Sequence, residues 1–248
     1  MKRQEEEEDE VCLDASFFIN DNYQLTTFTF GSQVLELFCL QSASTDFDLT
    51  GQLVWPGAML LNDYLSKNAE LLHGSSVIEL GSGVGVTGIL CSRFCRNVAL
   101  TDHNDEVLKI LKKNTELQTS SDNANNSNGG LAVEKLEWGN FDQTNQILQK
   151  YSGGFDIILG ADIYILYTRC YFFQQSSIPL LFDTVEKFIR FKGPGQCRFI
   201  LAYVSRAKIM DSMVINEATR HGMMINEIAG TRSVVGNLEG VIFEVTLP

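Results

Sequence analysis

The sequence predicts an α/β protein with a doubly wound, mostly parallel seven-stranded sheet and an N-terminal β-hairpin. Two observations lead to this class. From residue 76 onward, short apolar runs typical of buried strands alternate with segments of helical periodicity, and repeated βα units build parallel sheets. In residues 25–40, apolar and polar side chains alternate on both sides of Gly31 and Ser32, which indicates two antiparallel strands joined by a turn.

Each expected element has a local signal. Pro56 opens a helical pattern, because proline fits the first turn of a helix. Residues 119–130 are polar and of low complexity, which is typical of a loop. The strands of the sheet are expected at residues 77–80, 98–101, 131–136, 155–161, 198–204, 223–228 and 241–245. The helices between them are expected at residues 84–94, 106–117, 179–191 and 208–220.

The length and charge of the chain suggest its organisation. A chain of 248 residues with 44% hydrophobic residues can form one large domain with a small appendage. The net charge is −12, and part of it lies in the run EEEEDE at residues 5–10. We therefore expect a disordered acidic tail at residues 1–10, a hairpin extension at residues 11–50 and the main domain at residues 51–248.

The composition also argues against several classes of partner. An acidic surface repels duplex nucleic acid, so no nucleic-acid partner is expected. No apolar run approaches the roughly 20 residues that span a bilayer, so no membrane association is expected. The six cysteines form no C-x-x-C pair and the three histidines lack ligand spacing, so no metal is expected. We expect a monomer, since no heptad seam is present. We expect it in the cytoplasm, with the nucleus as a further location.

Residues 77–88, VIELGSGVGVTG, join an expected strand to an expected helix. Glycines permit a tight turn and let the backbone approach a ligand closely, and the first amides of the following helix can face an acidic group. Asp102 ends the next strand, 21 residues after Gly81, where a carboxylate can accept hydrogen bonds from a ribose diol. Asp162 ends a further strand, and doubly wound sheets bind ligands beyond such strand ends.

These residues alone leave the cofactor open. Gly83 to Gly88 also match the G-x-G-x-x-G pattern of dinucleotide-binding proteins, so an NAD-dependent oxidoreductase stays an alternative. Glu79 favours S-adenosylmethionine, because a buried acid would repel a pyrophosphate but attract the cationic amino end of that cofactor. Trp138 follows the third strand, where a flat ring could lie beside an adenine, although a tryptophan there also suits a core.

Five segments together resemble the class I methyltransferases of family 16, the lysine-methyltransferase-21-like proteins. Their order and spacing agree with that family over roughly residues 25–245. The resemblance implies a Rossmann-like methyltransferase fold over residues 51–248, with S-adenosylmethionine as the cofactor and a protein lysine as the methyl acceptor. The segments are residues 51–58 (GQLVWPGA), 77–88 (VIELGSGVGVTG), 100–102 (LTD), 136–139 (LEWG) and 158–162 (ILGAD).

The same resemblance implies roles for single residues. For methyl transfer to an amine, we expect Asp162 to orient or hydrogen-bond the amine of the substrate and Tyr164 to wall the channel that admits it, and the alternative for Asp162 is a strand-end residue that caps backbone amides. The implied cofactor contacts are Trp55 on the N-terminal side, Gly81, Ser82 and Gly83 along the methionine end, Asp102 at the ribose, Trp138 beside the adenine, and the backbone of Ala161.

The chain departs from the family pattern after Asp162. Tyr164 follows this acid by two residues, whereas family members commonly carry the tyrosine three residues on. A shift of one residue turns a side chain to the opposite face of an extended segment. Residues 166–175, LYTRCYFFQQ, also read as an insertion, either a loop that grips the substrate or a change that damages the site. A cofactor-binding protein without turnover therefore stays an alternative to the enzyme.

Overall fold

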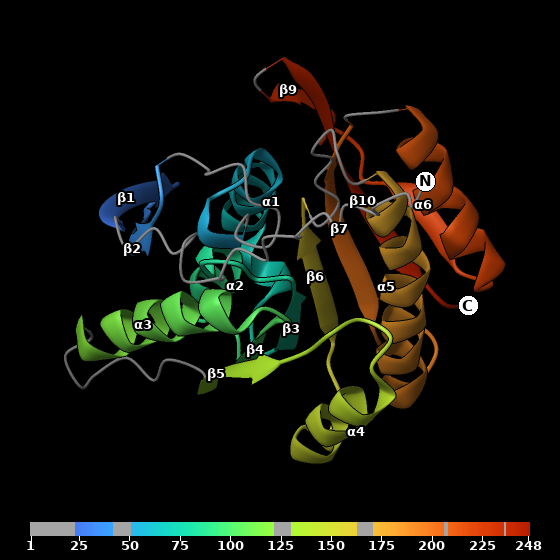
Figure 1. Ribbon diagram of the computed structural model, residues 1–248, viewed down its shortest axis with the longest axis horizontal. Coiled ribbons are helices and arrows are strands. Elements are labelled where there is room, and N and C mark those ends of the chain that lie inside the picture. The colour runs from blue at the N-terminus through green and yellow to red at the C-terminus, as the bar shows by residue number, and fades with distance from the viewer. Residues whose placement is uncertain (1–22, 42–50, 122–129, 163–170, 206–207, 236) are drawn as a thin grey trace, which may run out of the picture.

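A computed structural model describes residues 23–41, 51–121, 130–162, 171–205, 208–235 and 237–248 (Figure 1). The predicted acidic tail at residues 1–10, Tyr164 and most of the polar segment at residues 119–130 lie outside the described residues. Within them, no helix combines the length and the apolar composition that a bilayer span requires.

The main sheet has the predicted doubly wound, mostly parallel arrangement. Its strand order is β5-β4-β3-β6-β7-β10-β8, and β9 pairs with β10 beside this path. The five strands from β5 to β7 are parallel to one another, whereas β10 runs antiparallel to β7 and to β8. The strands are β3 (Ser76–Leu80), β4 (Asn97–Asp102), β5 (Gly130–Lys135), β6 (Ile157–Ala161), β7 (Arg198–Val204), β8 (Met224–Glu227), β9 (Ser233–Val235) and β10 (Leu238–Thr246).

Helices cover both faces of this sheet (Figure 1). One face carries α1, α2 and α3, and the other carries α4, α5 and α6. Each face has its own buried apolar cluster, and neighbouring residues of one strand alternate between the two faces. Val77 lies in the cluster under α1, α2 and α3, and Ile78 lies in the cluster under α4, α5 and α6. The central strands are therefore apolar almost throughout. The helices are α1 (Pro56–Lys67), the short 3₁₀ helix η3 (Ala69–Leu71), α2 (Val86–Cys91), α3 (Asp105–Ser121), α4 (Phe141–Lys150), α5 (Tyr171–Lys192) and α6 (Lys208–Arg220).

The structure differs from the sequence-based expectation most clearly at α5, α4 and β9. Helix α5 begins at Tyr171 rather than at residue 179, so Pro179 lies inside it and part of the expected insertion at residues 166–175 is helical. A proline donates no backbone hydrogen bond and fits best in the first turn of a helix, so the sequence pattern predicts a helix start at this position. Helix α4 was not predicted, although Asn140 caps it by accepting from the amide of Gln143 at 3.1 Å. Strand β9 was not predicted either, because three residues carry too short a pattern.

The predicted N-terminal hairpin is confirmed as β1 (Gln24–Phe30) paired with β2 (Gln33–Cys39). Phe30, Leu35 and Leu37 are fully buried and share the cluster beneath α1 and α2. The hairpin is thus packed on the helices of one face rather than on the sheet itself. Figure 1 shows it beside α1 and α3, at the outer side of that helical layer.

Asn114 of α3 links this hairpin to the loop that precedes α2. Its side-chain oxygen accepts from the amide of Phe38 at 2.8 Å, and its side-chain nitrogen donates to the carbonyls of Phe38 at 3.0 Å and Val84 at 2.9 Å. The residue is fully buried. It therefore satisfies three backbone groups of two separate segments in the interior, where an unpaired polar group is costly.

We predict that Asn114→Ala destabilises the protein by about 3 kcal/mol, because it leaves three backbone groups without a partner. Urea unfolding followed by circular dichroism measures this difference. Lys112→Ala, on the exposed side of the same helix, serves as the control and should stay within about 0.5 kcal/mol of the wild type. Equal stability of Asn114→Ala and this control would show that Asn114 does not link the two segments.

Candidate functional site

The predicted site residues follow neighbouring strands of the sheet. Strand β3 lies between β4 and β6, and Leu80 pairs with Thr101 on one side and Gly160 on the other. Gly81 after β3, Asp102 at the end of β4 and Asp162 after β6 therefore meet at one edge of the sheet. This is the carboxyl edge, where parallel sheets of this type bind their ligands.

The glycine loop between β3 and α2 is closely packed. Gly83 has a φ angle of +54°, in the left-handed region, and a Cβ atom there would lie 2.7 Å from the carbonyl oxygen of Gly51. Ser82 holds the loop to β4, since its amide donates to the carbonyl of Thr101 at 2.8 Å and its hydroxyl oxygen accepts from the amide of Thr101 at 3.0 Å. The loop is thus fixed by its backbone, and Gly83 cannot carry a side chain.

Asp102 joins the end of β4 to this loop. Its Oδ2 accepts from the amide of Gly83 at 3.2 Å, and its Oδ1 accepts from the amide of Asn104 at 3.1 Å. The side chain is buried, and burial raises the pKa of its carboxyl group. The residue predicted to bind a ribose therefore lies directly against the glycine loop.

Glu79 lies in β3 and is only 3% exposed. Its Oε2 accepts from the amide of Gly88, in the first turn of α2, at 3.0 Å. Burial raises the pKa of this carboxyl group to about 7, while the hydrogen bonds from Ser82, Gly88 and Thr87 act in the opposite direction. The structure therefore places a buried acid at the start of the helix that follows the glycine loop.

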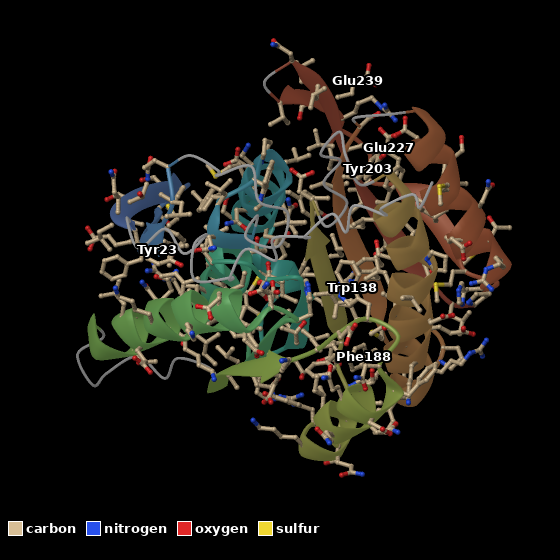
Figure 2. The ribbon with its side chains drawn as sticks, in the orientation of Figure 1. Tyr23, Trp138, Phe188, Tyr203, Glu227 and Glu239 are labelled. Carbon is tan, nitrogen blue, oxygen red and sulfur yellow. The ribbon has the colours of Figure 1, made fainter. Side chains whose placement is uncertain are left out.

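The segment after β5 carries Trp138 toward the same edge. The amide of Leu136 donates to the carbonyl of Asp102 at 2.9 Å, which continues the contact between β5 and β4. Trp138 is half-buried and packs against the apolar cluster between the sheet and α5 (Figure 2). The amide of Gly139 then donates to Thr184 of α5 at 2.9 Å. Trp138 thus packs on the core, and it follows β5, the strand that pairs with β4 and Asp102.

Gly57 connects Asp162 to the start of α1, where Trp55 lies. Trp55 is half-buried and occupies the N-cap of α1, but its side chain makes no capping hydrogen bond. Instead, Oδ2 of Asp162 accepts from the amide of Gly57 in the first turn of that helix at 2.8 Å. Asp162 is 3% exposed and has a φ angle of +52°, which is rare outside glycine. Half-buried Ala161 ends β6 directly before it.

Sequence reasoning missed three contributors to this arrangement. Gly51 supplies the carbonyl next to Gly83, and Gly57 supplies the amide for Asp162. A glycine in the first turn of a helix is unfavourable, so Gly57 signalled a close contact. Asn114 lies three residues after Leu111 on the apolar side of α3, and a polar residue at such a position also signals a specific partner.

Two other features of the structure lie apart from this edge. A surface hollow between α4 and α5 is lined by apolar residues such as Phe141 and Phe191 and by ion-paired residues such as Glu186 and Arg190. It includes none of the predicted site residues. In the part of the chain that the structure describes, no three His, Cys, Asp or Glu side chains gather as metal ligands do.

The sheet order, the glycine loop and the acid at the end of β4 define the chain as having the fold of S-adenosylmethionine-dependent methyltransferases. The crystal structure of magnesium protoporphyrin IX methyltransferase from Synechocystis PCC 6803, with bound S-adenosylmethionine, matches it with a TM-score of 0.52. That match covers 84% of this chain and 86% of the other at 12% sequence identity, so it supports the fold alone.

The particular family follows from the sequence. Residues 38–220 match the family model described as lysine methyltransferase, and the chain belongs to that family. This confirms the resemblance to the family 16 enzymes. The protein N-lysine methyltransferase METTL21A of Mus musculus is 32% identical over 57% of this chain and 59% of its own length. The EEF1A lysine methyltransferase 3 of Xenopus tropicalis is 34% identical over 54% of this chain and 50% of its own length. The chain thus spans between half and three fifths of these two relatives.

The raised pKa of Glu79 makes stability depend on pH. The carboxyl group titrates near 4.5 when unfolded and near 7 when folded, so the folded state holds an extra proton between these values. Its contribution to stability is present at low pH and is lost as the pH rises through about 7. Glutamine does not titrate, so its free energy of unfolding does not fall in this way. We predict that the free energy of unfolding of Glu79→Gln, relative to that of the wild type, rises by about 2 kcal/mol as the pH increases from about 5 to about 8.

Urea unfolding at several pH values in this window measures the difference. Glu36→Gln, on the exposed side of β2, is the matched control, and its difference from the wild type should stay constant. A constant difference for Glu79→Gln as well would contradict the buried, protonated state of Glu79.

Proposed function

We propose that the chain is an S-adenosylmethionine-dependent protein-lysine N-methyltransferase. The observation that carries this proposal is the hydrogen bond between Gly83 of the glycine loop and Asp102 at the end of the neighbouring strand. It puts a side-chain-free backbone beside a carboxylate that can accept from a ribose diol. Membership of the lysine methyltransferase family supports the reaction and the acceptor.

The start of α2 favours this cofactor over a dinucleotide. Dinucleotide-binding folds place a pyrophosphate on the amides of the helix that follows the glycine loop. Here the carboxylate of Glu79 already accepts from the amide of Gly88 in that first turn. A pyrophosphate would compete for the same donors and would meet a buried acid, whereas a cationic amino group near Glu79 would be stabilised. The NAD-dependent alternative is therefore disfavoured.

The residues at the carboxyl edge fit the parts of S-adenosylmethionine. We assign Gly81, Ser82 and Gly83 to its methionine end, with Glu79 behind them, because this loop presents backbone rather than side chains. The remaining assignments are Asp102 to the ribose, Trp138 to the adenine, Ala161 to a backbone contact and Trp55 to the N-terminal side of the site.

When bound, S-adenosylmethionine supplies a methyl group on a cationic sulfur that a neutral amine can displace in line. A lysine has a pKa of about 10.4 in water, so it must lose a proton before it reacts. We place the amine beside Trp55 and Ala161, which are half-buried, because loss of water there favours its neutral form. The protein then contributes mainly by holding the two reactants in line. Tyr164 stays a candidate for the channel wall on the resemblance alone.

The charge of the chain supports a basic protein as the substrate. Its net charge is −12, and residues 11–248 still carry most of that negative charge. Opposite charge steers association and favours a target rich in lysine and arginine. We therefore assign the methyl acceptor to a lysine in a basic segment of another protein.

Isothermal titration with S-adenosylhomocysteine tests the cofactor. We predict binding by the wild type, and an affinity at least about tenfold lower for Asp102→Ala, because a hydrogen bond to a charged group contributes about 1.5–3 kcal/mol. Asp63→Ala, an exposed acid of α1, is the control and should bind as the wild type does. Binding of NAD in place of S-adenosylhomocysteine would overturn the cofactor assignment.

A second experiment tests the acceptor. The chain is incubated with a labelled methyl donor and a set of basic proteins, and the products are mapped by mass spectrometry. We predict methyl groups on lysine side chains and no transfer by Asp102→Ala at cofactor concentrations that only the wild type binds. Methyl groups found only on arginine, on histidine or on a small molecule would contradict the lysine assignment. Cofactor binding without any transfer would identify a protein that has lost turnover.

A further inference from the structure

The N-terminus of α1 has an unusual cap. A helix commonly begins with a side chain of the N-cap residue that accepts from the amide two or three positions later. Here the N-cap is Trp55, Pro56 follows, and Gly57 is the second helical residue. The acceptor for the amide of Gly57 is the carboxylate of Asp162, 105 residues further along the chain, at 2.8 Å.

Both partners of this hydrogen bond are tightly held. The amide of Asp162 donates to the carbonyl of Ala202 in β7 at 3.0 Å, so its main chain is fixed to the sheet. A Cβ atom on Gly57 would lie 2.9 Å from both Cβ and Cγ of Asp162, so no larger residue fits there without displacement. Asp162 also keeps a left-handed backbone, which aspartate and asparagine tolerate better than most residues.

We propose that Asp162 is a positioning residue, whose carboxylate holds the start of α1, and with it Trp55, against the carboxyl end of β6. Ala161 and Trp55 are then kept at a fixed separation on two sides of the candidate cofactor site. This role differs from orienting the substrate amine. Oδ2 of the buried Asp162 accepts from the backbone amide of Gly57, and this contact needs no substrate. The effect on the cofactor rests on the proposed function, whereas the effect on Trp55 does not.

The fluorescence of Trp55 tests this proposal without any need for catalysis. The chain has two tryptophans, so Trp138→Phe leaves Trp55 as the single reporter. In that background, Asp162→Ala should shift the emission maximum of Trp55, because the helix start loses its acceptor. Asp162→Asn keeps an acceptor oxygen and a side chain that tolerates the left-handed backbone, so it should restore the emission.

A matched control separates this effect from general destabilisation. Asp156 also accepts from a backbone amide, that of Ser76 at 2.7 Å, but at the opposite edge of the sheet. Asp156→Ala should therefore lower stability without moving the emission of Trp55. If Asp162→Ala does not fold, Gly57→Ala tests the same contact from the other side, and it should shift the emission with Asp162 intact.

Cofactor affinity and turnover supply the remaining measurements. In the otherwise unchanged chain, Asp162→Ala should weaken S-adenosylhomocysteine binding about five- to tenfold, in line with the usual loss of a helix cap, and Asp162→Asn should recover most of that loss. The KM for S-adenosylmethionine should follow the same order.

Two results would overturn the proposal. One is wild-type emission of Trp55 together with wild-type affinity in Asp162→Ala. The other is a large fall in kcat in Asp162→Asn with emission and affinity intact, which would assign the charge of Asp162 to the substrate amine. Failure of the wild type to bind S-adenosylhomocysteine would refute the proposed function instead, and the emission of Trp55 would still decide the role of Asp162.

Discussion

The carboxyl edge of the sheet depends on one repeated interaction, in which a buried acid of a strand or its end accepts from the amide of a glycine. Backbone N–H groups that leave the regular ladder need an acceptor when they are buried. Glycine is the donor each time, because an added Cβ would meet a neighbouring atom within 3.0 Å at all three positions. The pairs are Glu79 with Gly88 at 3.0 Å, Asp102 with Gly83 at 3.2 Å and Asp162 with Gly57 at 2.8 Å.

These three pairs also place titratable carboxyl groups close together in the interior. Burial is the main cause of the raised pKa of Glu79, and the charge of Asp102 raises it further. Neutral pH therefore lies close to the point at which Glu79 loses its proton. A cation bound at the glycine loop would favour the ionised form. The same acids that organise the loops would therefore favour a positively charged ligand at this edge over a pyrophosphate.

The sequence was sufficient to predict the order of the elements, the glycine loop and the positions of Asp102 and Asp162, because these depend on local periodicity and on strand ends. It could not predict the partners of Asp162 or Asn114. Gly57 lies 105 residues from Asp162, and Phe38 and Val84 lie 76 and 30 residues from Asn114, so only the packed chain brings these partners together. Helix α4 and the early start of α5 escape prediction for a different reason: the signal for α4 is a single N-cap at Asn140, and a proline such as Pro179 usually marks a helix start although α5 continues through it.

The acids at this edge accept from backbone amides, and this arrangement suits the chemistry of methyl transfer to an amine. Displacement at a sulfonium methyl needs a neutral lysine held in line, and both desolvation and a nearby cation favour that neutral form. A carboxylate at the mouth would oppose this effect, since it stabilises the charged ammonium. The hydrogen bond from the amide of Gly57 directs one oxygen of Asp162 to the start of α1 and holds that helix start in place. An acid that follows β6 can therefore serve the reaction by fixing the shape of the site.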